Sequence, residues 1–385
     1  MNVVSLSFQT SQNHEVRYTM HDLVHDLARL TMADQLKIYD VAPPRKTRAH
    51  KYFRYSLLKK YDSTTKLENM PSKMRALHFS DSVQLNIRSG AFSFAMCLRI
   101  LDFSECSGVL LPASIGKLKQ LRCLIAPRMQ NETLPKCITE LSKLQYLNLN
   151  QSPKISALPD SVGKLGYLKY LCLSGCSGIS ELPESFGDLK SMVHLDMSGC
   201  SGITTVPECI TELSKLQYLN INGSSEITEL PISIGKLGCL KYLCLSGCSG
   251  ISKLPESFGD LKCMVHLDMS HCSGLTELPV SLGNLTHLQH LNLSGCSSVE
   301  ALPQILCGLT QLQYLNLSSL ARLVRLPDSI DFIATLTNLE HLDLSWNFDL
   351  ECLPESIGNL KRLHTMYLSH CFMLRSLPES IVNLG

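Results

Sequence analysis

Residues 168–189 read LKYLCLSGCSGISELPESFGDL, and this stretch contains both phrases that recur along the chain. The first phrase has the form Leu-x-x-Leu-x-Leu-Ser-x-Cys, and the second has the form Leu-Pro-x-x-Ile-x-x-Leu. With apolar substitutions the second phrase occurs twelve times, and its proline stands at positions 112, 135, 159, 183, 207, 231, 255, 279, 303, 327, 354 and 378. Successive prolines are 23 residues apart once, 24 residues apart nine times and 27 residues apart once. A fixed period of this kind means that one structural unit is stacked many times.

The length of the period and the two phrases together are typical of leucine-rich repeats, whose units are about 20–29 residues long. In each unit a segment such as 171–173 is expected to form a short strand, with its leucines inside and Tyr170 and Cys172 on the opposite face. The Leu-Pro step and the apolar residues after it return the chain to the core. We predict an α/β fold over residues 41–385, a leucine-rich-repeat solenoid with a curved parallel sheet on its concave face. The one long step indicates a three-residue insertion within residues 331–336.

Part of the repeat array is a recent duplication. Residues 163–198 match residues 235–270 at all but three of 36 positions, and residues 137–148 match 209–220 at the same offset of 72 residues. A block of three repeats has therefore been copied whole. Such expansion suits a surface under pressure to vary, although neutral unequal crossing-over gives the same pattern.

The composition excludes several function classes. The chain has 385 residues, 44% of them hydrophobic and 18% charged, with a formal net charge of +1. Near-neutrality argues against nucleic acid as the main ligand. The sequence contains no run of 18 apolar residues, and residues 1–15 carry no signal-like apolar stretch, so we predict no membrane span and a cytoplasmic location.

Seventeen cysteines could suggest disulfides or zinc, but many occupy one place in the repeat. An odd count without a signal peptide favours reduced, buried thiols. The pairs Cys172/Cys176 and Cys244/Cys248 have ligand-like spacing, yet by strand alternation the first of each pair faces outward and the second closes the turn. We therefore predict no metal site. The cysteines that close the strand phrase are Cys106, Cys176, Cys200, Cys248, Cys272, Cys296 and Cys371.

The first forty residues differ from the repeats. Residues 16–18 favour a short strand, and a helix is predicted from Met20, with apolar residues on one face. His21 and His25 are spaced by four residues, as are Asp22 and Asp26, but nothing downstream supplies further metal ligands at motif spacing. Neither a metal centre nor a hydrolase site is predicted here.

The phrase YTMHDLVHDLA at residues 18–28 resembles the Met-His-Asp segment that ends the nucleotide-binding region of plant intracellular NB-LRR disease-resistance proteins, particularly the coiled-coil type. Leu-Pro-type leucine-rich repeats follow that segment in the family, as they do in this chain. The resemblance implies that residues 1–40 are a small helical remnant of the winged-helix end of the nucleotide-binding region. It also implies that His21 senses the phosphates of bound ADP, with Asp22 as its structural partner. Alternatively, residues 21–33 only cap the first repeat.

No phosphate-binding loop of the form Gly-x-x-x-x-Gly-Lys-Ser/Thr occurs in the sequence. We therefore predict no cofactor, with ADP or ATP binding confined to a full-length receptor that contains this loop. The sequence ends within a repeat phrase, at Leu384 and Gly385, without the polar cap that solenoids need. On this ground we expect a fragment of a longer protein or a truncated gene product.

A basic run between residues 41 and 61 contains seven Lys or Arg residues and no Asp or Glu. In the resembled family the early repeats press against the nucleotide-binding module, and Arg45, Lys46 and Lys51 could steer that intramolecular contact. A solvated surface and a nuclear-import patch are the alternatives.

The concave face is the predicted partner-binding surface. Its Tyr, His, Asn and Asp side chains are suited to protein recognition, and the His-Asp pairs recur without a nucleophile or an enclosing pocket, so no catalytic residue is predicted. Alternatively, the rings only stack to stabilise neighbouring strands. Trp346, the single tryptophan, is the best individual candidate for a contact. The predicted contacts, besides Trp346, are Tyr146, Tyr170, His194, Asp196, Tyr218, Tyr242, His266, Asp268, His290, Tyr314, His341 and Asp343.

Two functions remain open from the sequence. The first is the non-enzymatic recognition and autoinhibition region of a plant NB-LRR immune receptor, which binds a pathogen effector, a host protein or its own nucleotide-binding module. The second is a stand-alone intracellular repeat scaffold, because the repeat phrase also resembles that of the Ras-associated repeat proteins.

Overall fold

The fold was analysed in a computed structural model that describes residues 36–39, 55–59, 67, 72–80, 82, 85–88, 90–93, 95–299, 306, 308–326 and 335–384. His21 and Asp22, the predicted nucleotide-sensor residues, lie outside the described residues. So do Arg45, Lys46 and Lys51 of the basic run. These assignments stay predictions.

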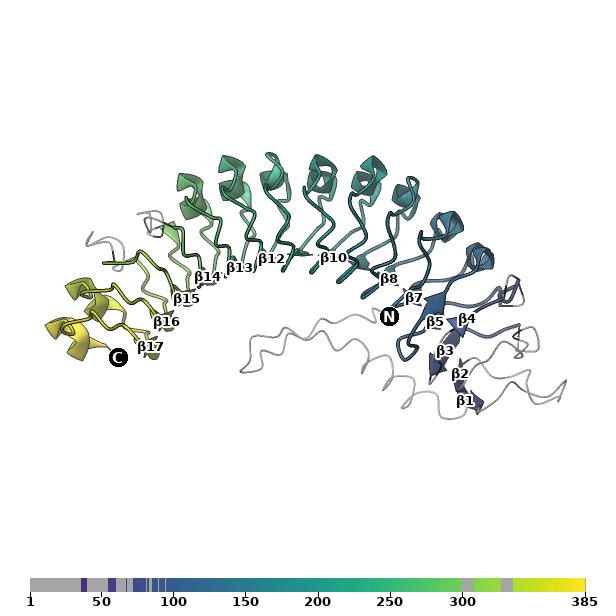
Figure 1. The fold of residues 1–385 in the computed structure, drawn as a ribbon, viewed down its shortest axis with the longest axis horizontal. Coiled ribbons are helices and arrows are strands. Elements are labelled where there is room, and N and C mark those ends of the chain that lie inside the picture. The colour runs from purple at the N-terminus through teal and green to yellow at the C-terminus, as the bar shows by residue number, and fades with distance from the viewer. Residues whose placement is uncertain are drawn as a thin grey trace.

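The repeats form one curved, parallel sheet of 15 strands, and Figure 1 shows these strands along the inner edge of the arch. Each strand pairs in register with the strands of the neighbouring repeats, as His194 of one strand does with Tyr218 of the next. The prediction of a parallel sheet on the concave side is confirmed. In sheet order the strands are β1 Leu36–Tyr39, β2 Tyr55–Lys59, β3 Ala76–Ser80, β5 Ile100–Asp102, β7 Cys123–Ile125, β8 Tyr146–Asn148, β9 Tyr170–Cys172, β10 His194–Asp196, β11 Tyr218–Asn220, β12 Tyr242–Cys244, β13 His266–Asp268, β14 His290–Asn292, β15 Tyr314–Asn316, β16 His341–Asp343 and β17 Thr365–Tyr367. A second, two-stranded sheet pairs β4 Leu85–Asn86 with β6 Val109–Leu110.

The sheet extends into the range 1–40 that the sequence assigns to the N-terminal segment. Strand β1 lies before residue 41 and pairs in parallel with β2 over four residues. The domain boundary itself stays a prediction.

The convex side of the described repeats consists of 3₁₀ helices (Figure 1). In most of them proline is the N-cap residue in an extended conformation, as Pro183 is with φ −69° and ψ 151°. Proline suits this place because its fixed φ begins the turn and its missing N–H leaves no donor unpaired. These helices are η3 Ala113–Lys117, η4 Lys136–Glu140, η5 Val162–Lys164, η6 Glu184–Asp188, η7 Glu208–Glu212, η8 Ile234–Lys236, η9 Glu256–Asp260, η10 Val280–Asn284, η12 Glu355–Asn359 and η13 Glu379–Asn383.

A continuous apolar core fills the space between the sheet and the 3₁₀ helices. In the repeat around β9, four residues are each at most 1% exposed: Leu171 in the strand, Leu173 directly after it, Ile179 in the loop and Phe186 in η6. Each repeat contributes the same set and packs on the sets before and after it. Burial is therefore shared between neighbours, as the stacking argument requires.

The turn cysteines bind the carbonyl of the preceding repeat. The Sγ–H of Cys248 donates to the carbonyl oxygen of Ile221 at 3.2 Å, and the thiol is fully buried. Asn347 holds the equivalent place in a later repeat and donates to the Leu317 carbonyl oxygen at 2.9 Å. The cysteine thiols and the Asn347 amide thus have the same structural role, which is to donate a hydrogen bond to a carbonyl oxygen of the preceding repeat. Equivalent thiol–carbonyl contacts of 3.0–3.6 Å are made by Cys106, Cys176, Cys200, Cys272, Cys296 and Cys371.

The prediction of buried turn thiols is confirmed for six of the seven, while Cys371 is partly exposed. Burial raises the pKa of Cys176 and of Cys248 to about 11, so both are protonated at neutral pH. Cys172 and Cys244 occupy the outward positions expected for them, but Cys244 is only 4% exposed. The outward face is therefore more closely packed than alternation alone suggests.

Candidate functional site

A ladder of nine rings runs along the concave face, one ring from each of nine consecutive strands. In-register pairing places each ring beside the next. The rings from His194 to Tyr314 stack with centroids 3.9–4.5 Å apart. The outer steps of the ladder, from Tyr146 to His194 and from Tyr314 to His341, are tilted with centroids 5.7–6.2 Å apart. The ring ladder consists of Tyr146, Tyr170, His194, Tyr218, Tyr242, His266, His290, Tyr314 and His341.

Stacking is the structural role that the alternative assigns to these rings, and each stacked pair contributes about 0.5–1.5 kcal/mol beyond area burial. Most of the rings are partly buried, Tyr218 is buried and His341 is exposed. Burial lowers the pKa of His194 to about 4, so this imidazole is neutral at physiological pH. A structural role and a recognition role are compatible, because a stacked ladder still presents ring edges and polar atoms along the sheet.

A second ladder lies two residues after the rings, at the carboxyl ends of the strands. Asp196 Oδ1 accepts the backbone N–H of Ser198 at 3.0 Å, and Asn220 Oδ1 accepts that of Asn222 at the same distance. This contact closes the turn after the strand, so Asn and Asp are equally suited to it. The predicted contact residues Asp196, Asp268 and Asp343 therefore each use one oxygen structurally. The equivalent acceptors elsewhere are Asp102, Asn148, Asn292 and Asn316.

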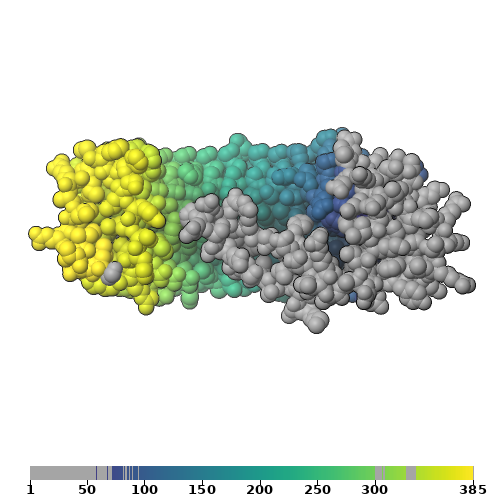
Figure 2. All heavy atoms as spheres, turned by 90° about the horizontal axis from the view of Figure 1, so that it is seen from below, coloured from purple at the N-terminus to yellow at the C-terminus, as the bar shows by residue number. Residues whose placement is uncertain are grey.

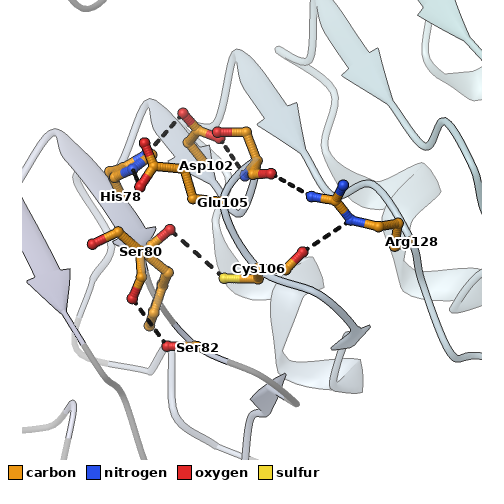
Figure 3. Close-up of polar contacts among 9 residues, drawn as sticks. His78, Ser80, Ser82, Asp102, Glu105, Cys106 and Arg128 are labelled. Carbon is orange, nitrogen blue, oxygen red and sulfur yellow. Dashed lines mark hydrogen bonds and ion pairs between the residues drawn. The ribbon is translucent and has the colours of Figure 1, made fainter.

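The early repeats contain a charged network that sequence reasoning missed. Figure 3 shows His78 from β3 facing Asp102 from β5, with Nδ1 and Oδ2 2.9 Å apart. Glu105 Oε2 lies 3.7 Å from Nε2 of His78, and Arg128 donates to the carbonyl oxygens of Ser104 and Cys106. Burial opposes protonation of His78, but its contacts with the two carboxylates outweigh this effect and raise its pKa. Burial by itself would raise the pKa of Asp102, but the contact with His78 and the hydrogen bond from the Ser104 N–H outweigh burial and lower it.

An aromatic cluster lies on the turn edge of the last two described repeats. Trp346 stacks on His370 with centroids 3.9 Å apart, and Phe348 lies parallel to Phe372 at 5.7 Å. Trp346, Phe348 and Phe372 are 48%, 49% and 73% exposed, which is unusual for large apolar side chains. Sequence reasoning found only Trp346. The missed signal lies in the comparison of repeats. Trp346 and His370 stand at the position of Gly247, and Phe348 and Phe372 stand at the position of Ser249.

Trp346 also has a left-handed backbone conformation, with φ +63°. The same turn position is glycine in five repeats, for example Gly247 with φ +71°. Left-handed backbone is unfavourable for a bulky side chain. Non-glycine residues adopt the same conformation at this position in five other repeats, so the turn accepts the indole at the conformational cost of a left-handed residue. Those residues are Arg128, Gln151, His271, Ser319 and His370.

Metal and membrane features are absent from the described part of the chain. Within those residues no group of three or more His, Cys, Asp or Glu side chains could hold a metal ion. The cysteines of that part are free thiols. No helix among the described segments has the length and apolar character required to cross a bilayer.

Comparison with family models identifies leucine-rich repeats along the array. A model of a leucine-rich repeat region matches residues 73–199. A leucine-rich repeat model matches residues 239–261, 287–309 and 338–360. Together the two models match about half of the chain. A search of curated proteins found no match.

Solved structures share this architecture. A leucine-rich-repeat protein of Leptospira interrogans is 25% identical, with a TM-score of 0.68, over 90% of this chain and 91% of that chain. The leucine-rich-repeat domain of the type III effector XopL is 27% identical with a TM-score of 0.50, over 56% of this chain and 73% of that chain. The Drosophila Toll–Spätzle complex structure, at 18% identity and a TM-score of 0.60 over 87% of this chain and 42% of that chain, agrees in fold alone.

Proposed function

The chain belongs to the leucine-rich-repeat proteins, and we propose that it is a non-enzymatic recognition module that binds a protein partner along its concave face. The observation that carries this proposal is the in-register pairing of the sheet. It aligns the ring ladder and the Asn/Asp ladder into two continuous rows. Tyrosine, histidine and aspartate rows on a rigid sheet offer preorganised contacts, which lower the ordering cost of binding.

Figure 2 views the molecule from the concave side, where the teal and green repeats form one continuous face that leads to the yellow C-terminal repeats. The aromatic cluster of Trp346, Phe348, His370 and Phe372 lies in those last repeats. Exposed aromatic rings are enriched among residues that dominate binding energies. We assign this cluster to the same partner surface as its apolar anchor.

The test compares variants that keep the ladder stacked with variants that break it. Tyr242→His retains a ring that the chain itself uses at position 266, whereas Tyr242→Ala removes the ring between Tyr218 and His266. Partners captured from plant cell extract by the wild-type chain should be lost with Tyr242→Ala and with Phe372→Ala. They should be retained with Ile232→Ala, an exposed residue outside both surfaces.

A thermal melt of each variant separates loss of contact from loss of fold. Retained capture by Tyr242→Ala and Phe372→Ala at wild-type yield would reject the concave and edge surfaces as the binding site. Loss of capture only in parallel with a lower melting temperature would make the ladder a structural feature.

At the finer level we propose that the module is the recognition and autoinhibition region of a plant NB-LRR immune receptor in the cytoplasm. The support is the order of two features along the chain, the phrase at residues 18–28 and the Leu-Pro-type repeats whose first Leu-Pro step is at residues 111–112. In trans, the chain should suppress signalling by the nucleotide-binding module of such a receptor. Charge reversal at Arg45, Lys46 and Lys51 should weaken suppression, and unchanged signalling with both proteins present would favour the stand-alone scaffold instead.

A further inference from the structure

Three carboxylates recur along the concave sheet at a constant interval. Asp196 ends β10, Asp268 ends β13 and Asp343 ends β16, so consecutive members of this carboxylate row are three strands apart. The first interval is copied within the 72-residue duplication, whereas the second spans the 27-residue repeat. The interval in strands is the same although the interval in sequence differs.

The carboxylate row has no cation beside it in the described residues. The in-register neighbours of Asp196 are Cys172 and Asn220, and those of Asp268 are Cys244 and Asn292. Those of Asp343 are Asn316 and Tyr367. No described Lys, Arg or His forms an ion pair with any of the three. Lys169 and Lys241, which directly precede Tyr170 and Tyr242 of the ring ladder, form no ion pair with these carboxylates.

All three carboxylates are partly buried, and burial raises the pKa of Asp196. Asp196 accepts the backbone N–H of Ser198 through Oδ1 and the Cys172 thiol through Oδ2 at 4.0 Å, and both donors are neutral. A cation therefore adds stabilisation that these neutral donors do not supply to a partly buried carboxylate.

The chain itself shows how a cation satisfies this position. Asp102 holds the same place in β5, and its in-register neighbour is His78, which lies 2.9 Å from the carboxylate. The Oδ1 atom of Asp102 still accepts the Ser104 N–H, as the other aspartates accept their serine N–H groups. The second carboxylate oxygen is therefore the one that meets a cation. In the carboxylate row that oxygen has no such neighbour among the described residues.

We propose that the concave face binds an extended peptide segment of the partner that carries Lys or Arg at every fourth residue. The proposal deepens the recognition function above and rests on it. Strands lie about 4.8 Å apart, so three repeats span about 14 Å, while four residues of extended chain span about 13 Å. Residues four apart in an extended chain also point to the same side, so each cationic side chain meets one carboxylate.

The probes are two fluorescent eleven-residue peptides of identical composition. In the matched peptide Arg stands at positions 1, 5 and 9, and in the mismatched peptide Arg stands at positions 1, 4 and 7, where alternate side chains point away from the sheet. Fluorescence anisotropy with the full chain at fixed ionic strength gives both dissociation constants. The matched peptide should bind at least about tenfold more tightly, because hydrogen bonds to charged groups exceed 1.4 kcal/mol, the free energy of a tenfold change.

The chain offers an isosteric control for the carboxylate row. Asp196→Asn and Asp268→Asn keep the backbone contact, as Asn220 shows, and remove only the charge. Each should weaken the matched peptide about tenfold. Asp260→Asn makes the same charge change on η9 of the convex side and should leave the affinity unchanged.

Equal affinity for the two peptides, or equal effects of Asp268→Asn and Asp260→Asn, would overturn the proposal. If neither peptide binds while partner capture still depends on Tyr242 and Phe372, this inference fails and the recognition function stands. If that capture also shows no dependence on either residue, the recognition surface itself is wrong.

Discussion

Position 346 allows the strain of the turn to be measured separately from the contacts of the side chain. Trp346 has φ +63°, a conformation that five other repeats give to glycine. Trp346→Ala removes the indole and keeps a Cβ in the left-handed region. Trp346→Gly removes the indole and the strain together. The two variants therefore differ mainly in the backbone preference.

The expected magnitudes follow from the geometry. A non-glycine residue in the left-handed region costs about 1–2 kcal/mol. Loss of the stack on His370 costs about 0.5–1.5 kcal/mol, and loss of the roughly half-buried indole surface costs about 1 kcal/mol more. Trp346→Ala should thus lower the free energy of unfolding by about 2 kcal/mol. Trp346→Gly should remain within about 1 kcal/mol of the wild type, because relief of strain offsets the lost contacts.

Urea unfolding followed by circular dichroism gives these differences, provided that the denaturant dependence is unchanged between variants. The reciprocal control is Gly247→Ala, where φ is +71° and an added Cβ would meet no atom closer than 3.6 Å. It should cost about 1–2 kcal/mol from strain alone. Gly238→Ala, at a place without positive φ and with open space around the Cβ, should be neutral or stabilising.

Equal stabilities of the Ala and Gly variants at 346, with Gly247→Ala as harmless as Gly238→Ala, would refute the reasoning. The indole would then carry no conformational cost, and its retention would no longer indicate a binding role.

Four further expectations concern thiols and titration. Under native conditions a maleimide should label exposed Cys97, Cys239 and Cys263 quickly and Cys176 and Cys248 slowly, as peptide mass spectrometry can show; equal rates would place the turn thiols at the surface. Cys248→Ala should lower the free energy of unfolding by about 1–2 kcal/mol. Cys248→Ser should lower it by less, because Ser224 holds the equivalent position in the preceding repeat and makes the same carbonyl contact at 3.4 Å. A larger loss with serine than with alanine would contradict the hydrogen-bond role. Because the pKa of His78 is raised in the folded state, protonated His78 stabilises the fold below pH 6.5. This stabilisation is lost as the pH rises through the folded pKa, so the free energy of unfolding falls there. His78→Gln should flatten this fall. His194 acts in the opposite direction, because its pKa of about 4 makes stability fall as pH drops below 6.5, and His194→Tyr should remove this fall; unaltered pH profiles would reject both assignments.

The sequence predicted the solenoid well because the period and the apolar pattern act locally and repeatedly. A departure from the leucine pattern in one repeat does not obscure a pattern that a dozen repeats share. The parallel register follows because every repeat places its strand phrase at the same point of the unit, even in the 27-residue repeat. The turn cysteines were also predictable, since their place in the repeat fixes their burial. The convex segments were less informative, because a five-residue segment with a single large apolar residue, such as ESFGD at residues 184–188, does not by itself distinguish a 3₁₀ helix from an irregular turn.

The candidate site was predictable in position but not in energetics. Alternation placed Tyr218 and His266 on the concave face, yet it could not show that the rings stack at 3.9–4.5 Å and bury one another. The ion pair between His78 and Asp102 joins residues 24 positions apart in neighbouring early repeats. The repeat spacing places the two residues side by side, but it does not show that their side chains meet or that Glu105 joins them.

At some positions of the repeat, two residue types make the same structural contact. The choice between them can therefore set which partner the surface recognises. Asn220 and Asp196 close their turns with the same contact at the same distance, so folding does not choose between amide and carboxylate. Tyrosine and imidazole rings likewise stack in one ladder. The charge and hydrogen-bonding pattern of the concave face can therefore vary without penalty to the solenoid. A carboxylate at every third strand is one pattern among many that the fold would tolerate. Its first interval was copied with the 72-residue block, and its second was kept across the 27-residue repeat, where the peptide proposal predicts that the interval in strands is preserved.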